Sequence, residues 1–98
     1  MVSVTSRIAK IPNQLHTEID GRIVVLNAAA GKYFEFDEIG SVIWARIDRY
    51  PLVADLCEPL VRDYRVDVQT VQADVSRLLG VLAANDLITV TAIDRGNA

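Results

Sequence analysis

The chain has 98 residues, of which 51% are hydrophobic and 23% charged, with a formal net charge of -3. This length fits one domain with a modest core, and the slight acidic excess argues against a protein that mainly holds nucleic-acid phosphates. The single cysteine, Cys57, excludes an intrachain disulfide and a cysteine-based zinc site. No apolar run could span a bilayer and no signal-peptide core is visible, so we expect a cytoplasmic protein with no membrane partner.

The first third of the chain predicts a hairpin. Asp20-Gly21, a preferred pair for a two-residue turn, lies between LHTEI and RIVVLN. In that register Leu15 faces Leu26 across the ladder. The segment 23–26 is apolar on both faces, which is typical of the middle strand of a small sheet.

A third strand is predicted at residues 33–36, after a reversal at AAAGK. Gly31 can take the positive φ that such a reversal often needs. Alternation along the strand points Phe34 and Phe36 toward the core and leaves Tyr33 and Glu35 facing solvent or a partner. The three strands form an antiparallel meander.

A helix is expected to begin at Asp37, a favourable N-cap residue. The apolar period changes there from 2 to 3.6, with Ile39, Val42, Ile43 and Ile47 at helical spacing. Gly40 is poor for helix propensity, so we interpret it as a place where helix and sheet come close. Trp44 is expected in the core.

Two further helices follow. Residues 51–64 carry an apolar stripe, and Pro59 should kink or shorten that helix. The longest helix is predicted at 67–85, with an apolar face made of Val71, Val75, Leu78, Leu79 and Leu82. Residues 87–90 read as a short strand or an extended tail, and residues 91–98 as frayed.

The predicted fold class is therefore α+β and winged-helix-like: a three-stranded antiparallel β-meander followed by three α-helices. We expect an N-terminal extension at 1–14, a folded domain at 15–90 and a C-terminal tail at 91–98.

No residue pattern indicates catalysis, so we expect no enzyme, no metal and no cofactor. His16 is the only histidine and has no nearby nucleophile to serve. Cys57 lies on the apolar side of the second helix and is interpreted as a small core residue. Gly31 and Gly40 are too far apart to form a phosphate-binding loop.

The predicted topology leaves one edge of strand 33–36 without a partner. That strand contains no proline or lysine to block pairing, so an extended peptide could add to it as a further strand. Helix 67–85, with Asp74 beside its apolar face, could form the other wall of a groove. An edge covered by residues 1–14 or by a second copy of the chain is an equally open interpretation.

The motifs, taken together, resemble the PqqD-like family, the bacterial RiPP recognition elements that bind the leaders of ribosomal precursor peptides. The resemblance covers about residues 15–90 and is carried by DGRIVVLN, GKYFEFDEIGSVIW, Tyr64-Arg65-Val66 and the helix from Asp74-Val75 to Leu87-Ile88. It looks most like the stand-alone recognition proteins of lasso-peptide biosynthesis.

The resemblance implies a leader peptide that adds to the third strand and lies against the third helix. The strand residues implied are Tyr33, Phe34, Glu35 and Phe36, and the helix residues are Val71, Asp74, Val75 and Leu78. It further implies a leader with a Tyr-x-x-Pro element, a separate cysteine peptidase that receives the leader, and an ATP-dependent macrocyclase that receives the core peptide.

Three alternatives stay open at this point. One is a chaperone for a radical SAM enzyme in pyrroloquinoline quinone biosynthesis, from within the same family. Another is a winged-helix DNA-binding regulator, since the third helix carries Gln69, Gln72, Ser76 and Arg77, although it lacks a basic cluster. We favour no nucleic-acid partner. The third is a homodimer through the strand edge, so the chain is expected to be a monomer or weak homodimer.

Overall fold

The computed structural model describes residues 2–12 and 14–92. Five strands and three helices occupy this part of the chain, in the order β1 (Ser6–Lys10), β2 (Leu15–Ile19), β3 (Arg22–Asn27), β4 (Lys32–Glu35), α1 (Glu38–Arg46), α2 (Val53–Tyr64), α3 (Val68–Ala84) and β5 (Ile88–Ala92). The predicted fold class, a three-stranded antiparallel meander followed by three helices, is confirmed.

The meander is a sheet in the order β2-β3-β4. Its predicted register is confirmed, because Leu15 faces Leu26, and Tyr33 lies opposite Leu26 on the other side. Gly21 and Gly31 take positive φ angles of 78° and 67° at the two turns. The reversals therefore use glycine where a side chain would be strained.

A second, two-stranded sheet pairs β1 with β5 in antiparallel register, from Ser6 opposite Ala92 to Lys10 opposite Ile88. Of the two alternatives for residues 87–90, a short strand or an extended tail, the strand is confirmed for residues 88–90. The expectation that residue 91 begins a frayed tail was wrong, since Thr91 and Ala92 continue β5 and pair with β1; residues 93–98 lie outside the described part of the chain.

The first helix begins directly after its predicted N-cap residue, Asp37, and the third begins directly after Asp67. The Asp37 carboxylate accepts the Gly40 N–H at 2.7 Å, and Asp67 accepts the N–H groups of Gln69 and Thr70. The expectation that Pro59 shortens the second helix was wrong, because α2 continues through it to Tyr64. Pro59 removes one hydrogen bond from the helix, but the ring is buried, and apolar packing compensates for that loss.

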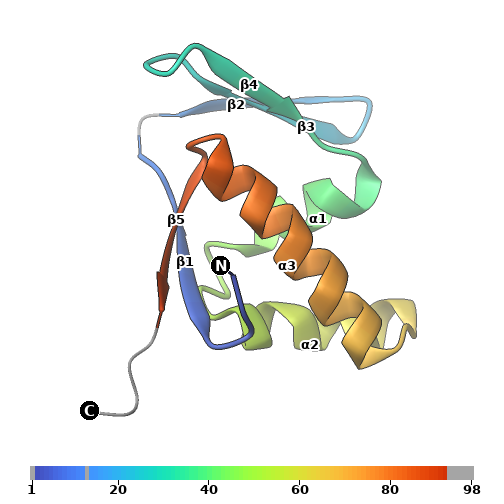
Figure 1. Ribbon diagram of the computed structural model, residues 1–98. Helices are drawn as coiled ribbons and strands as arrows, with labels where there is room; N and C mark the ends of the chain where they lie inside the picture. The colour runs from blue at the N-terminus through green and yellow to red at the C-terminus, as the bar shows by residue number, and fades with distance from the viewer. Residues whose placement is uncertain (1, 13, 93–98) are drawn as a thin grey trace.

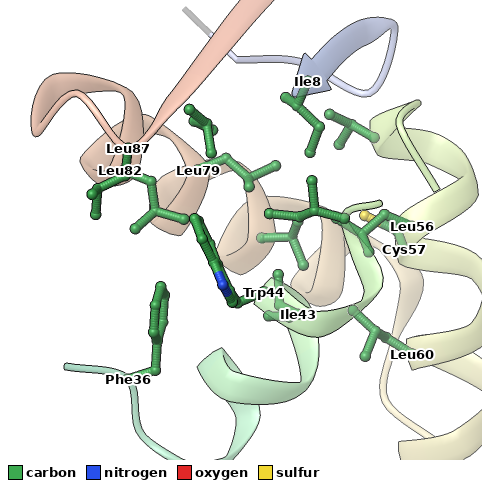
Figure 2. Packing of buried hydrophobic residues seen from close by; sticks show 14 of the residues in the cluster. Ile8, Phe36, Ile43, Trp44, Leu56, Cys57, Leu60, Leu79, Leu82 and Leu87 are labelled. Atoms are coloured by element: carbon green, nitrogen blue, oxygen red, sulfur yellow. The ribbon is translucent and has the colours of Figure 1, made fainter. Parts of the chain in front are cut away.

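All three helices lie on one side of the β2-β3-β4 sheet, and the β1-β5 pair runs down the end of the helical layer (Figure 1). Between them lies one apolar core, in which Phe36, Trp44, Leu56, Leu79 and Leu82 are at most 2% exposed (Figure 2). The core position predicted for Trp44 is confirmed. No helix in the described residues is long and apolar enough to cross a membrane.

β1 contributes to this core although it precedes the meander. Ile8 is 1% exposed and its N–H donates to the Pro51 carbonyl at 2.7 Å. The Lys10 ammonium lies 4.6 Å from the centre of the Trp44 ring and 3.1 Å from Asp48. Residues 6–10, which lie in the segment expected as an extension, therefore pack as part of the folded unit.

Candidate functional site

β4 is an edge strand with one unused row of backbone groups. The Phe36 N–H donates to the Ile23 carbonyl at 2.9 Å, and antiparallel pairing alternates inward and outward groups along a strand. The backbone N–H and C=O of Tyr33 and Glu35 therefore point away from β3. No strand within residues 2–12 and 14–92 pairs with that edge.

The described N-terminal residues do not cover the β4 edge. β1 pairs with β5 instead, at the other end of the molecule (Figure 1). The interpretation in which residues 1–14 form a strand on β4 was therefore wrong for the residues that the structure describes.

A groove of about 650 Å³ opens between β4 and α3. We call it the β4–α3 groove. Apolar side chains from α3, Leu78 and Val81, face Phe34 from β4 across it. The residues that line it are Arg22, Phe34, Glu35, Phe36, Asp37, Ile39, Gly40, Ile43, Asp74, Arg77, Leu78 and Val81.

A smaller cavity of about 190 Å³ adjoins the groove where α1, α2 and α3 meet. We call it the helix pocket. It shares Ile39, Ile43 and Asp74 with the groove. Its remaining lining is Leu60, Tyr64, Val66, Val71 and Val75. Groove and pocket together offer an extended binding surface that ends in an apolar hollow.

Charged groups stand around the groove and are mostly engaged within the protein. The Arg22 Nε donates to the Phe36 carbonyl at 3.1 Å, Asp37 caps α1, and Arg77 contacts the Asp74 carboxylate at 2.7 Å. The Asp74–Arg77 pair is solvent-exposed, so it adds little to stability. An apolar floor with a polar rim suits the recognition of an extended peptide.

The structure brings most of the predicted site residues together. Phe34, Glu35, Phe36, Asp74 and Leu78 line the groove, while Val71, Asp74 and Val75 line the helix pocket. Phe36 and Val75 are nearly fully buried, so they shape the floor more than they offer contact area. Tyr33 lines neither cavity and is 72% exposed on the opposite face of the sheet.

Sequence reasoning missed several lining residues. Ile39 belongs to the apolar helical period of α1, yet its side chain is 45% exposed and lines both cavities. Periodicity placed Ile39 only on the apolar side of the helix, because the period alone cannot separate a core position from one at the rim. Tyr64 and Arg77 lie within predicted helices, Tyr64 as part of the family motif and Arg77 as a polar residue considered for DNA contact, and Arg22 lies in the predicted hairpin. None of the three carried a signal that placed it at the groove or the pocket.

The side chains considered for chemistry lie apart from the groove. Cys57 is buried in the core, and burial raises the pKa of its thiol. His16 is exposed on β2, which lies at the opposite edge of the sheet from β4. Among the described residues, no three His, Cys, Asp or Glu side chains gather into a set that could hold a metal ion.

The face of the meander that points away from the helices carries an apolar row. Leu15, Leu26 and Tyr33 lie side by side across β2, β3 and β4, and they are 65%, 39% and 72% exposed. Rows of this kind are unusual on a surface that contacts only water.

Comparison with known proteins places this arrangement in a family. The family described as "Coenzyme PQQ synthesis protein D (PqqD)" matches residues 22–88, from the start of β3 to the start of β5. The chain belongs to the PqqD family. The resemblance seen in the sequence is thereby confirmed, and the matched range contains every residue that lines the groove and the helix pocket.

A solved structure is similar over nearly the whole domain. The structure of TbiB1 in complex with the TbiA(beta) leader peptide matches with a TM-score of 0.78 and 27% sequence identity. The match covers 86% of this chain and 98% of TbiB1. Among curated proteins, no match was found. This PqqD family member therefore shares its architecture with a protein whose bound partner is a leader peptide.

Proposed function

We propose that this chain is a non-catalytic protein that captures the leader of a ribosomal precursor peptide. The leader adds as a strand along residues 33–36, which are the last three residues of β4 and the residue that follows it, and lies against α3. The observation that carries the proposal is the unpaired β4 edge directly beside the β4–α3 groove. The similarity to TbiB1, which is bound to a leader peptide, supports it.

In this proposal the backbone of β4 and the side chains of the groove recognise different features of the leader peptide. The outward N–H and C=O groups of Tyr33 and Glu35 supply hydrogen bonds that do not depend on the leader's sequence. Successive side chains of an added strand point to opposite faces. Those on the helix side enter the groove between Phe34 and Leu78, and their size and polarity give specificity.

The helix pocket suits an aromatic anchor of the Tyr-x-x-Pro kind. Its walls are apolar, which favours burial of a ring. Asp74 stands at the boundary between groove and pocket, where its carboxylate can accept a hydrogen bond from a phenolic hydroxyl. This combination favours tyrosine over phenylalanine at the anchor position.

Delivery to other enzymes completes the proposed role in lasso-peptide biosynthesis. A separate cysteine peptidase receives the captured leader, and an ATP-dependent macrocyclase receives the core peptide. A leader strand on β4 extends the meander, so its outward side chains lie next to Tyr33. The exposed row of Leu15, Leu26 and Tyr33 would then continue onto the leader, which supports this face as the docking surface for the peptidase.

A second candidate within the PqqD family is a chaperone for a radical SAM enzyme. The family description, which names coenzyme PQQ synthesis, is the observation that favours it. Both candidates use the same groove and differ in the peptide that enters it. DNA binding is less well supported, because Arg77 on α3 is paired with Asp74 and the helix carries no other basic side chain.

The test is a binding selection followed by a titration. A displayed library of random 20-residue peptides, with the TbiA(beta) leader peptide included, is selected on the purified chain. The enriched peptides are labelled with fluorescein and titrated by polarisation. We expect saturable binding that falls roughly tenfold or more in Ile39→Lys, because a charge then enters the wall shared by groove and pocket.

Leu15→Lys is the matched control. Leu15 is also an exposed apolar residue, but it lies on β2, away from the groove. Enrichment of no peptide, or equal losses in both variants, would overturn the proposal. Tight, salt-sensitive binding of a short DNA duplex would favour the DNA-binding alternative instead. A preference for a quinone-precursor peptide over the lasso leader would favour the chaperone.

A further inference from the structure

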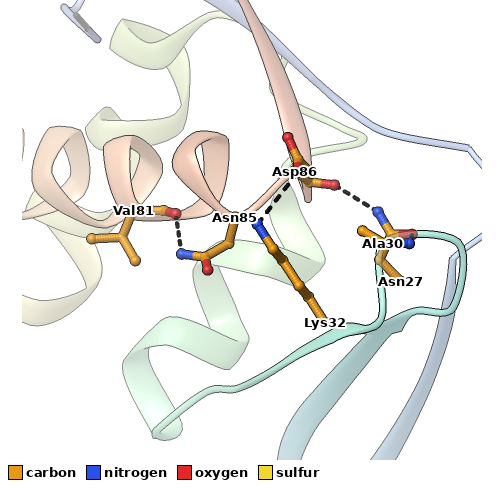
Figure 3. Close-up of polar contacts among 6 residues, drawn as sticks. All are labelled: Asn27, Ala30, Lys32, Val81, Asn85 and Asp86. Atoms are coloured by element: carbon orange, nitrogen blue, oxygen red, sulfur yellow. Dashed lines mark hydrogen bonds and ion pairs between the residues drawn. The ribbon is translucent and has the colours of Figure 1, made fainter.

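A buried asparagine joins the meander to the far end of α3. Asn27 is the last residue of β3 and is 7% exposed. Its Nδ2 donates to the Asp86 carbonyl at 2.9 Å, and its Oδ1 accepts the Ala30 N–H at 3.1 Å (Figure 3). The amide therefore uses both of its ends, one within its own turn and one across to a segment 59 residues away.

The Asp86 end of this bridge is hydrogen-bonded to the end of α3, since the Asp86 N–H donates to the Ala83 carbonyl at 3.2 Å. Asp86 follows α3 and takes a left-handed φ of 61°. The next residue returns to the helix, since the Leu87 N–H donates to the Leu82 carbonyl at 3.0 Å. A carbonyl held in this way is a fixed acceptor, so the bond from Asn27 ties the meander to the end of α3 and not to a loose loop.

The Asn27 end lies directly beside the edge strand. Asn27 is opposite Lys32, the first residue of β4. The Lys32 ammonium also reaches the Asp86 carboxylate, at 3.5 Å, across an exposed surface (Figure 3). An exposed ion pair of this length contributes less to stability than a buried amide hydrogen bond does. The Asn27 amide is therefore the stronger of these two polar ties between the meander and the segment that follows α3.

β4 is supported at its two ends, with the groove between the supports. At the other end, Phe36 packs on Trp44 and its carbonyl accepts from Arg22. Gln14, which precedes β2, donates to the Leu87 carbonyl at 3.0 Å, but it holds the strand farthest from the groove. Loss of the Asn27 bond would leave the first residues of β4 free to move relative to Val81 and Leu78.

We propose that Asn27 is a positioning residue for peptide binding: its side-chain amide sets the width of the β4–α3 groove. This inference rests on the proposed function. A peptide strand must pair with the edge of β4 and place its inward side chains against α3 at the same time. Both contacts form together only when strand and helix are held at one separation.

The chemistry of the bridge explains why asparagine fills this position. Aspartate would keep the acceptor for Ala30 but lose the donor, and it would place a carboxylate against the Asp86 carbonyl oxygen. Alanine would leave the Asp86 carbonyl and the Ala30 N–H without their side-chain partner. Asn27→Asp and Asn27→Ala therefore remove the same tie by two routes.

The first test measures the separation directly and needs no ligand. Nitroxide labels are placed at positions 33 on β4 and 73 on α3, which are exposed and line neither the groove nor the helix pocket, in a Cys57→Ala background. Pulsed electron paramagnetic resonance then gives the distance distribution. We expect one narrow distribution with Asn27 present and a broader one in Asn27→Ala and Asn27→Asp. An unchanged distribution in both variants would overturn the proposal.

Asn85→Ala is the matched control. The Asn85 side chain donates to the Val81 carbonyl at 2.8 Å, within the same end of α3, so its hydrogen bond stays inside the helix and does not reach the meander (Figure 3). It removes one hydrogen bond at this corner but leaves the bridge intact. We expect the distribution of the parent protein in this variant. Broadening equal to that of Asn27→Ala would show general loosening of the corner and overturn the proposal.

The second test measures peptide affinity, with a peptide selected on the unaltered chain. We expect roughly tenfold weaker binding in Asn27→Ala, as for the loss of about one hydrogen bond, and no more than about a twofold change in Asn85→Ala. Excess peptide should restore the narrow distance distribution in Asn27→Ala, because the bound peptide and the Asn27–Asp86 hydrogen bond both hold β4 at the same distance from α3. Equal peptide affinities in Asn27→Ala and Asn85→Ala would contradict the positioning role of Asn27. A selection that yields no peptide would instead refute the proposed function and leave the distance result standing.

Discussion

The ring of Phe36 lies against the backbone of Gly40, where an added Cβ atom would come within 3.0 Å of Phe36 Cδ1. The same ring is 5.4 Å from the centre of the Trp44 ring and only 1% exposed. The junction between β4 and α1 therefore closes on a buried aromatic that has little room to move. This contact fixes one end of the edge strand that borders the groove.

Gly40→Ala should destabilise the protein even though it improves helix propensity. The substitution gains up to about 1 kcal/mol in helix propensity, but crowding of a well-packed ring costs about 1–3 kcal/mol. We expect a net loss of roughly 1 kcal/mol in the free energy of unfolding, measured by urea denaturation. Gly80→Ala on α3 is the control, because its added Cβ meets nothing within 4 Å, and it should be stabilising. Equal gains in both variants would contradict the close approach at Gly40.

Glu35→Pro should abolish edge pairing while the fold survives. The Glu35 N–H points to the open edge of β4, so its loss removes no bond within the meander. The Phe34 N–H points toward β3, so Phe34→Pro should break the β3–β4 ladder. We expect Glu35→Pro to retain a cooperative thermal transition and lose peptide binding in a polarisation titration. Phe34→Pro should lose both. Full peptide affinity in Glu35→Pro would exclude strand addition at this edge.

Asp67→Ala should weaken α3 at its start. The carboxylate accepts two N–H groups, from Gln69 at 3.0 Å and Thr70 at 3.2 Å. Loss of an N-cap of this kind costs about 1 kcal/mol in the free energy of unfolding. Asparagine caps equally well, so Asp67→Asn should stay close to the parent protein in urea denaturation. A similar loss in both variants would assign the effect to charge and not to capping.

The buried Cys57 thiol should make stability fall at alkaline pH. Burial raises the pKa of this thiol above its ordinary value of 9.0. As pH rises past that value, the unfolded chain releases the thiol proton before the folded chain does, which favours unfolding. The protonated Cys57 thiol therefore makes its full contribution to the free energy of unfolding below pH 9, and that contribution is lost as the pH rises above 9.

The measurement compares urea unfolding of the parent protein and of Cys57→Ala across this pH range. Tyrosine and lysine titrations affect both proteins alike, so the difference between them isolates the thiol. We expect the difference to shrink as the pH rises beyond 9, because only the parent protein carries the thiol. A difference that does not change with pH would show that the thiol ionises equally in both states.

Local signals in the sequence determined most of the secondary structure. Asp20-Gly21 specified the hairpin and its register, and Asp37 specified where α1 begins. These features depend on residues close together in the chain, through turn chemistry and capping. The inward position of Phe36 and the outward position of Tyr33 also followed from alternation along one strand.

Pro59 shows where a local rule fails. The sequence predicts that Pro59 kinks or shortens the helix, and the shortening is wrong, since α2 runs on to Tyr64 because its buried face packs against α3. Tertiary packing of an apolar stripe contributes more than the one hydrogen bond that proline removes. The strength of that packing depends on residues far away in the chain.

What the sequence by itself determined is the meander, the three helices and the family resemblance, and it left a free or covered edge at residues 33–36 as open alternatives. Only the tertiary structure decided that α3 lies beside that edge, that Ile39 and Tyr64 extend the site into a pocket, and that β1 pairs with β5 and not with β4. It also placed Asn27 against Asp86 across 59 residues. The physical reason is that caps, turns and alternation act between near neighbours, whereas a groove and its supports arise from contacts between segments whose meeting depends on how the whole core packs.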